Sequence, residues 1–247
     1  MRVDAILFPR DLSECDLSNT LAVVVDIFRA TSTIITAIHN GAKEVVPFKE
    51  TEEVEERALD YPAGQALKCG ERNGYTYSGF DLGNSPLEYN RDLIYNKTIL
   101  FSSTNGSQLF SKIQSARKVI IGGFLNIERV VNSIIQNKQD CLIACAGNYG
   151  NISIEDSVYA GMILAMIKKN GVIIEMNDEA RVSMILYQYY QDDFQSIMRE
   201  SSHGRHLSSI GKEEDMKFCL QVNTVDCLPV YNGQTIIKGP EKINEHG

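Results

Sequence analysis

Short runs of apolar residues recur along the chain, and most of them lead through a polar, glycine-bearing loop into a helical pattern. The first run, LAVVVD at 21–26, is apolar and β-branched up to its closing aspartate, which is typical of a strand buried on both faces. After the loop IFRA, the hydroxyl residues at 31–33 are good N-caps for a helix that should end at Asn40 and Gly41. The run GAKEVVPF then supplies a second strand and completes one β–α–β unit.

The same alternation recurs in the middle of the chain. Apolar runs at 98–103, 118–123 and 141–147 predict strands. They lead into helices expected from about Ser107, over Ile127–Asn137, and from Ile154 to Gly171. A shorter run, QALKCG, leads instead into the long loop ERNGYTYSGFDLGNSP. Strands that alternate with helices indicate an α/β fold whose mostly parallel sheet is covered by helices on both faces, a three-layer α/β/α arrangement.

The C-terminal part has a different pattern. It is helical from about Asp178 to Gln221, and CLPVY-NG-QTII then predicts an antiparallel hairpin on an Asn-Gly turn. Because no linker, repeat or low-complexity stretch interrupts the chain, we predict a single α/β domain over residues 1–247.

Charge and cysteine content narrow the classes of function. The chain has 247 residues, with 24 Lys and Arg against 32 Asp and Glu and a net charge of −8. This acidic balance argues against non-specific nucleic-acid binding, which needs a basic face. No apolar run approaches the ~20 residues of a membrane span, and the first residues lack the apolar core of a signal peptide, so we expect a cytoplasmic protein with no membrane partner. The six cysteines form no CxxC pair, which argues against a zinc site.

Polar residues concentrate in the loops that follow the predicted strands. Ligands of open α/β sheets bind outside the carboxyl ends of the strands, and helix N-termini favour anions. Arg29 and Arg72 add guanidinium groups that hold phosphate or carboxylate through two bonds. Arginines that grip an anion beside carboxylates that hold a metal suggest phosphoryl-transfer chemistry. The hard oxygens suited to Mg²⁺ come from Asp26, Glu71, Asp81, Glu155 and Asp156.

Several of these residues also have a purely structural interpretation. Asp26 could cap a turn, and Arg29 could pair with any surface carboxylate. Thr31 and Thr33 are helix caps whether or not an anion binds, and the Asn84-Ser85-Pro86 stretch could be an ordinary turn.

The acidic pair and the histidines are open to the same alternative. The sequence from Ser153 to Asp156 is a capping box, in which Asp156 bonds the backbone and only Glu155 is free. His203 and His206 could be solvated surface residues or could belong to the site.

Signatures of several phosphatase families are absent. A cysteine phosphatase needs arginine six residues after its cysteine, but Asn151 stands six residues after Cys145. A haloacid-dehalogenase phosphatase needs a second acid where Phe28 stands, and neither Arg-His-Gly nor a P-loop is present. Cys145 is therefore expected to be a non-catalytic thiol.

Five sequence blocks in a fixed order are much more specific than any of them alone. DIFRATST, GERNG, GFDLGNSP, STNGS and CAGNYGNISIEDSVYAG together resemble the 2-phosphosulfolactate phosphatase family, a Mg²⁺-dependent family first associated with coenzyme M biosynthesis. The resemblance implies hydrolysis of (2R)-2-phospho-3-sulfolactate to 3-sulfolactate and phosphate. The partner it implies is a small anionic phosphorylated substrate, and a homodimer is left open.

The resemblance also assigns site residues. The role of Asp26 as nucleophile, base or metal ligand stays open, with ligand or base favoured. Two alternatives to the implied activity also stay open: a phosphatase of the same fold that acts on another small phosphorylated 2-hydroxy acid, and a catalytically silent anion-binding domain. The implied residues are Asp26, Arg29, Glu71 and Arg72 for catalysis; Thr31, Thr33, Asn84, Ser85, Thr104, Asn105, Gly106, Ser107, Gly147 and Arg205 for substrate binding; and Asp26, Glu155 and Asp156 for metal.

Overall fold

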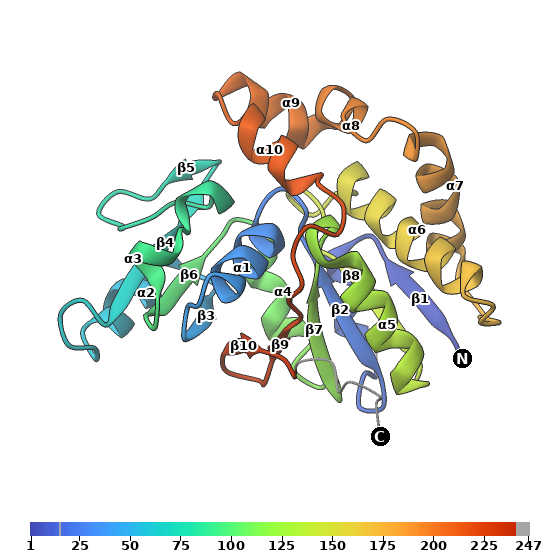
Figure 1. Ribbon diagram of the computed structural model, residues 1–247, viewed down its shortest axis with the longest axis horizontal. Helices are drawn as coiled ribbons and strands as arrows, with labels where there is room; N and C mark the ends of the chain where they lie inside the picture. The colour runs from blue at the N-terminus through green and yellow to red at the C-terminus, as the bar shows by residue number, and fades with distance from the viewer. Residues whose placement is uncertain (15, 241–247) are drawn as a thin grey trace.

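Ten strands form one mixed sheet in the computed structural model, which describes residues 1–14 and 16–240 (Figure 1). Their order across the sheet is β1-β8-β2-β7-β9-β10-β3-β6-β4-β5. The strands are β1 (Val3–Ile6), β2 (Leu21–Val25), β3 (Glu44–Phe48), β4 (Ala66–Arg72), β5 (Tyr75–Thr76), β6 (Thr98–Ser102), β7 (Lys118–Gly122), β8 (Cys141–Cys145), β9 (Pro229–Tyr231) and β10 (Ile236–Lys238).

The sheet consists of two sets of parallel strands joined by the C-terminal hairpin. Strands β1, β8, β2 and β7 pair in parallel with one another, and so do β3, β6 and β4. The predicted hairpin β9–β10 lies between the sets, antiparallel to β7 on one side and to β3 on the other. Within each set the carboxyl ends are level, since Val25 pairs with Gly122 and Cys145 while Ser102 pairs with Phe48 and Gly70.

Helices cover both faces of the first set, which confirms the predicted three layers. Strand β2 is buried along its whole length, and its residues alternate between two cores. Val23 packs in the core under α5 and α6, whereas Val24 packs in the core under α1 and α4. The bounds of these helices are α1 (Ala30–His39), α4 (Gly106–Lys112), α5 (Ile127–Asn137) and α6 (Ile154–Lys169).

The remaining helices flank this framework. The helical stretch expected from Asp178 is four separate helices, of which α7 packs along α6 while α8 to α10 gather at the top of the view in Figure 1. None of the helices in the described residues has the length and apolar character needed to cross a membrane. The bounds are α2 (Thr51–Ala58), α3 (Arg91–Ile94), α7 (Asp178–Tyr190), α8 (Ser196–Glu200), α9 (Ser202–Ser209) and α10 (Glu213–Cys219), with short 3₁₀ helices at Pro9–Glu14, Pro86–Glu88 and Phe124–Asn126.

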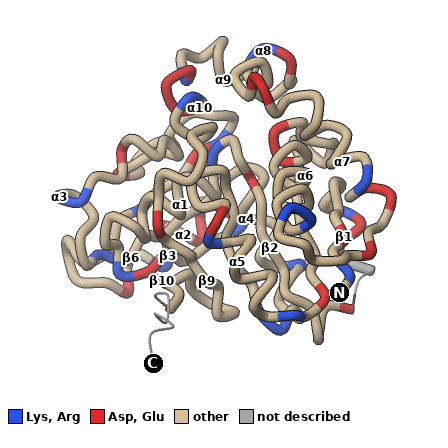
Figure 2. Tube along the Cα trace, turned by 45° about the vertical axis from the view of Figure 1, so that its right-hand side comes forward, with Lys and Arg blue, Asp and Glu red and all other residues tan. Residues whose placement is uncertain are grey.

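Charged residues of both signs are spread over the trace. Figure 2 shows acidic and basic positions interspersed among the elements, so the excess of acids is not gathered in one segment. A site that binds an anion must therefore hold its cations locally.

Candidate active site

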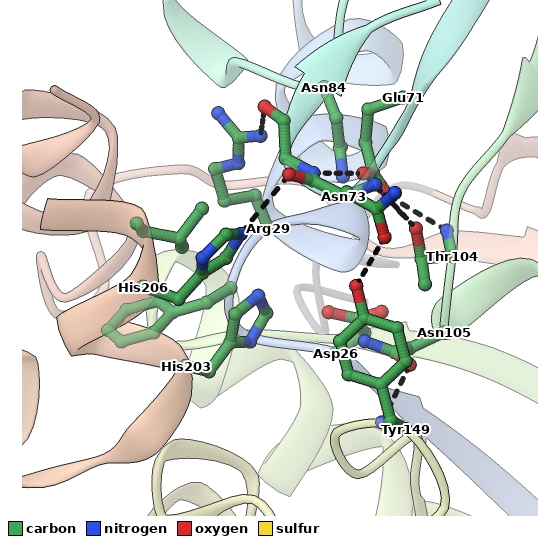
Figure 3. A pocket seen from close by; sticks show the side chains of 13 residues that line it. Asp26, Arg29, Glu71, Asn73, Asn84, Thr104, Asn105, Tyr149, His203 and His206 are labelled. Atoms are coloured by element: carbon green, nitrogen blue, oxygen red, sulfur yellow. Dashed lines mark hydrogen bonds between the residues drawn. The ribbon is translucent and has the colours of Figure 1, made fainter. Parts of the chain in front are cut away.

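A pocket lies where loops from both strand sets meet helix α9 (Figure 3). It contains about 330 Å³ of space between atoms, part of which is open to solvent. The first set contributes the loops after β2 and β8, and the second set contributes the end of β4 and the loop after β6. The lining residues are Asp26, Phe28, Arg29, Glu71, Asn73, Gly74, Asn84, Thr104, Asn105, Tyr149, His203, His206 and Leu207.

Asp26 closes strand β2 and is 5% exposed. Its backbone is fixed by Thr31, whose hydroxyl donates to the Asp26 carbonyl at 2.9 Å and accepts from the Asp26 N–H at 3.2 Å. A Cβ atom on Gly106 would lie 2.5 Å from Asp26 Oδ2, so this glycine allows α4 to approach the carboxylate. Burial raises the pKa of Asp26 to about 7; nearby His203 opposes the rise, and the acidic Glu71 adds to it.

Glu71 is equally buried, but its carboxylate is saturated with hydrogen bonds. It accepts from the Gly74 N–H at 2.7 Å, and from the Thr104 N–H and hydroxyl at 2.8 and 3.2 Å. Glu71 therefore ties the β4–β5 turn to the loop after β6, and the predicted residue Thr104 takes part in this link while it lines the pocket.

Arg29 lines the pocket as the centre of a buried network. Its Nη1 pairs with Asp215 of α10, and its Nη2 donates to the Gly74 carbonyl at 2.9 Å. Ser85 donates its hydroxyl to the other oxygen of Asp215 at 2.6 Å. The bidentate grip that the sequence predicted for a ligand is thus used in part by the protein itself.

The loop that carries Asn84 is positioned from α1. Thr33 donates its hydroxyl to the Asn84 carbonyl at 3.0 Å. The side-chain oxygen of Asn84 is buried and makes no hydrogen bond within the described residues, although Asn84 lines the pocket. Thr33 and Ser85 are therefore supporting residues, whereas Asn84 presents an unpartnered acceptor.

The adjacent acids Glu155 and Asp156 begin α6 but have different surroundings. Asp156 accepts the Ile27 N–H at 2.8 Å and the Gly147 N–H at 3.1 Å, and its own N–H is capped by Ser153 at 3.2 Å. Burial raises the pKa of Asp156, and its acidic neighbours reinforce the rise. Neither acid is among the residues that line the pocket. Asp156 anchors two loops, and the metal role that the resemblance implies for the pair stays a prediction.

Glu155 instead contacts His203, one of the two histidines that sequence reasoning left open. Glu155 Oε1 lies 3.1 Å from His203 Nδ1, and Glu155 Oε2 is buried without a partner in the described chain. Burial lowers the pKa of His203, but the hydrogen bond and charge of Glu155, together with Asp26, outweigh burial and raise it.

The lining residues that were not singled out from the sequence are Phe28, Asn73, Gly74, Tyr149 and Leu207. Tyr149 donates its hydroxyl to Asn73 Oδ1 at 2.8 Å, and its N–H donates to Asn105 at 3.0 Å, so it links loops from both strand sets. His206 Nε2 lies 3.1 Å from the Asn73 carbonyl. Asn73, Tyr149 and Phe28 all lie inside the sequence blocks GERNG, NYGN and DIFRATST, which is the signal that could have found them.

Several predicted residues lie outside the pocket. Arg72 follows Glu71 directly in β4, so its side chain points to the opposite face of the strand from the side chain of Glu71. On that face it donates to the Glu71 and Lys49 carbonyls, both at 2.9 Å. Arg205 donates to the Glu200 carbonyl at 2.6 Å and is exposed. Of the three predicted arginines, Arg29 alone lines the pocket. The other predicted residues outside the lining are Thr31, Thr33, Ser85, Gly106, Ser107, Gly147, Glu155 and Asp156.

The donor set of the pocket limits what metal it could hold. Among residues 1–14 and 16–240, no group of three or more His, Cys, Asp and Glu side chains forms a ready ligand set. Mg²⁺, however, is commonly bound by one or two carboxylates together with substrate phosphate and water. The carboxylate of Asp26 and the unpartnered oxygen of Asn84 fit a cation held in that way.

The chain matches known proteins over most of its length. A family model for 2-phosphosulfolactate phosphatase matches residues 6–234. A probable 2-phosphosulfolactate phosphatase of Caldanaerobacter subterraneus subsp. tengcongensis is 40% identical over 218 residues, which cover 88% of this chain and 90% of the relative. The corresponding protein of Thermotoga maritima is 39% identical over 96% of this chain and 98% of its own. These matches confirm the resemblance carried by the five blocks: the chain belongs to the 2-phosphosulfolactate phosphatase family.

Proposed function

We propose that the protein hydrolyses 2-phospho-3-sulfolactate to 3-sulfolactate and phosphate in this pocket. Family membership supports the substrate class. The observation that carries the proposal is Asp26, a buried carboxylate with a pKa of about 7 that faces a pocket shared by both strand sets. A strongly perturbed titratable group inside a cleft is typical of a catalytic site.

The substrate class matches the polar groups of the pocket. Phosphate, carboxylate and sulfonate together carry about four negative charges near neutral pH. The pocket offers the guanidinium of Arg29 and the imidazoles of His203 and His206. The side-chain amide of Asn105 adds a neutral hydrogen-bond donor to the same pocket. A small acid with several anionic groups can therefore be oriented at several points, which favours one reactive geometry.

Mg²⁺ is part of the proposal. Asp26 and Asn84 would hold it together with the phosphate, where it would offset phosphate charge and stabilise the charge that develops during transfer. The raised pKa of Asp26 reflects a carboxylate that burial leaves short of compensating charge. Glu71 accepts three hydrogen bonds, and it acts by holding the two loops of the second strand set in register.

A comparison of substrates tests the proposed function. Phosphate release should be measured from phosphosulfolactate, phospholactate and phosphoglycolate, each with Mg²⁺ and with excess chelator. We expect the highest kcat/KM for phosphosulfolactate, loss of turnover on chelation, and recovery when Mg²⁺ is restored. A higher kcat/KM for another phosphorylated acid would overturn the substrate assignment. Full activity in excess chelator would overturn the Mg²⁺ assignment. No turnover of any of the three compounds would favour a silent binding domain.

A further inference from the structure

A buried carboxylate, that of Glu155, meets His203, one of the two histidines that line the pocket. Glu155 lies in the first turn of α6, and His203 lies in the first turn of α9. Their side chains are 1% and 15% exposed, and Glu155 Oε1 is 3.1 Å from His203 Nδ1. Figure 3 shows the His203 ring projecting into the pocket on the side of Asp26.

The ring of His203 is fixed in orientation from two sides. Glu155 occupies Nδ1, and the Phe28 ring packs against the imidazole edge with ring centroids 6.3 Å apart. The start of α9 is itself held by Ser201, whose hydroxyl accepts the Gly204 N–H at 2.9 Å. Nε2 makes no hydrogen bond within the described residues. A carboxylate on one ring nitrogen sets the tautomer and makes the other nitrogen available for chemistry.

Glu155 differs from its neighbour Asp156 in that it does not anchor a loop. Asp156 uses both carboxylate oxygens to hold backbone N–H groups, so it stabilises the fold. Glu155 has His203 as its hydrogen-bond partner and leaves its second oxygen without one among the described residues. His206, in turn, has its Nε2 beside the Asn73 carbonyl, which leaves His203 as the histidine with a carboxylate behind it and an open nitrogen.

We propose that His203 is the catalytic acid that protonates the leaving oxygen, and that Glu155 is a positioning residue acting through it; this rests on the proposed function. The bond between phosphorus and the ester oxygen breaks, its electron pair stays on that oxygen, and the proton on His203 Nε2 moves to it, giving the free hydroxyl of sulfolactate. A water oxygen forms the new bond to phosphorus, and the proton that this water loses restores His203. A secondary alkoxide is a poor leaving group, so this proton transfer is worth about 10²–10⁴-fold in rate.

The test uses two leaving groups on one acid skeleton. Alongside phosphosulfolactate, the analogue with sulfur in place of the bridging oxygen is assayed, because a thiolate departs without protonation. His203→Gln should lower kcat for the oxygen ester by about 10²-fold or more and change kcat for the sulfur analogue by less than ~10-fold. Glu155→Gln should show the same pattern at smaller amplitude. His39→Gln, at the exposed end of α1, is the matched control and should behave as wild type.

The outcomes separate this inference from the proposed function. Equal losses of kcat on both esters, with melting curves showing folded variants, would overturn the acid role while the phosphatase function stands. Quenching in alkali, in which a phosphohistidine is stable, would show a nucleophile instead if phosphate were found on His203. If wild type does not cleave the sulfur analogue, a second experiment tests the acid role of His203. Imidazole added to His203→Ala should restore turnover of the oxygen ester, and a failure to restore it would count against that role. Wild-type protein inert towards every phosphorylated acid would overturn both proposals.

Discussion

The two strand sets bring carboxylates of opposite character to the same pocket. Asp26 at the end of β2 and Glu71 in β4 are both 5% exposed and both line the pocket. Glu71 accepts three hydrogen bonds from Gly74 and Thr104. For Asp26, burial outweighs the backbone N–H of Ala30, and its pKa rises to about 7. Glu71 thus stabilises the folded protein, whereas the buried charge of Asp26 destabilises it. A ligand that binds Asp26 would offset this destabilisation.

The same contrast recurs between adjacent residues of α6. Asp156 is fully used by backbone N–H groups, and Glu155 is left with one histidine. In both pairs, the carboxylate with unmet hydrogen-bonding capacity is the one assigned a part in the chemistry. Natural active sites commonly give up stability in this way. Substitutions that remove the charge of a carboxylate while keeping its shape test this difference between Asp26 and Glu71.

Asp26→Asn should have the largest effect. Removing the carboxylate that meets the phosphoryl group should reduce kcat by more than about 10²-fold, since one electrostatic contact in a transition state is typically worth that much. At the same time the variant should melt at a higher temperature than wild type at pH 8. A melting temperature below that of wild type at pH 8 would contradict the account of Asp26.

The pH dependence of that stability gain follows from the pKa of Asp26. The folded-state pKa is raised from 3.8 to about 7, so the folded protein holds this proton more tightly than the unfolded chain does. The stability present below pH 3.8 is therefore lost as pH rises towards 7, by up to about 4 kcal/mol. The melting-temperature gain of Asp26→Asn should be greatest above pH 7 and vanish near pH 4, and Mg²⁺ should stabilise only wild type.

Arg29→Lys should have the next largest effect. Lysine keeps the charge but cannot contact Asp215 and the Gly74 carbonyl with one planar fork. We expect both a lower melting temperature and a kcat/KM reduced by about 10²-fold, measured by thermal denaturation and steady-state kinetics. Asp215→Asn is the control, since it should lower stability while leaving the guanidinium in place. Unchanged kinetics in Arg29→Lys would remove Arg29 from the site.

Glu71→Gln should affect stability in the opposite direction from Asp26→Asn. The amide would place an N–H₂ group against one of the N–H donors of Gly74 or Thr104, and a lost charged hydrogen bond costs about 1.5–3 kcal/mol. The melting temperature should fall at all pH values near neutrality, and kcat should fall by about 10-fold. An increase in melting temperature would show that Glu71 resembles Asp26 after all.

Much of the framework could be predicted from the sequence because it depends on local patterns. Strands β2, β6, β7 and β8 are continuous apolar runs, and β9–β10 carries an Asn-Gly turn. The insertion of that hairpin between the two parallel sets could not be predicted, since hydrophobic pattern does not specify strand order. Helix α2 was not predicted because only Thr51 and Val54 of its residues are buried, which gives no apolar stripe.

The site was predicted less well for a related reason. Motif blocks locate a loop but do not state which way each side chain points. Glu71 and Arg72 are neighbours on a strand, and their side chains point to opposite faces. Glu155 and Asp156 are neighbours on a helix, and their side chains point in different directions around its axis. His203 could not be chosen from the sequence, because its carboxylate partner lies 48 residues away on another helix.

Cys145→Ser should have the smallest effect on turnover. Cys145 ends β8 and pairs in register with Val25, one residue before Asp26, so it lies on the same edge of the sheet as the proposed chemistry. Its thiol is fully buried, and burial together with Asp156 raises its pKa, which disfavours the nucleophilic thiolate. The hydroxyl of serine would be buried in an apolar core at a cost of about 1–3 kcal/mol, so the melting temperature should fall by a few degrees. The kcat of the folded variant should stay within about threefold of wild type, because no step of the proposed transfer uses this side chain. A loss of several orders of magnitude would indicate that Cys145 is a nucleophile and that the chemistry depends on β8 and not on Asp26 at the end of β2.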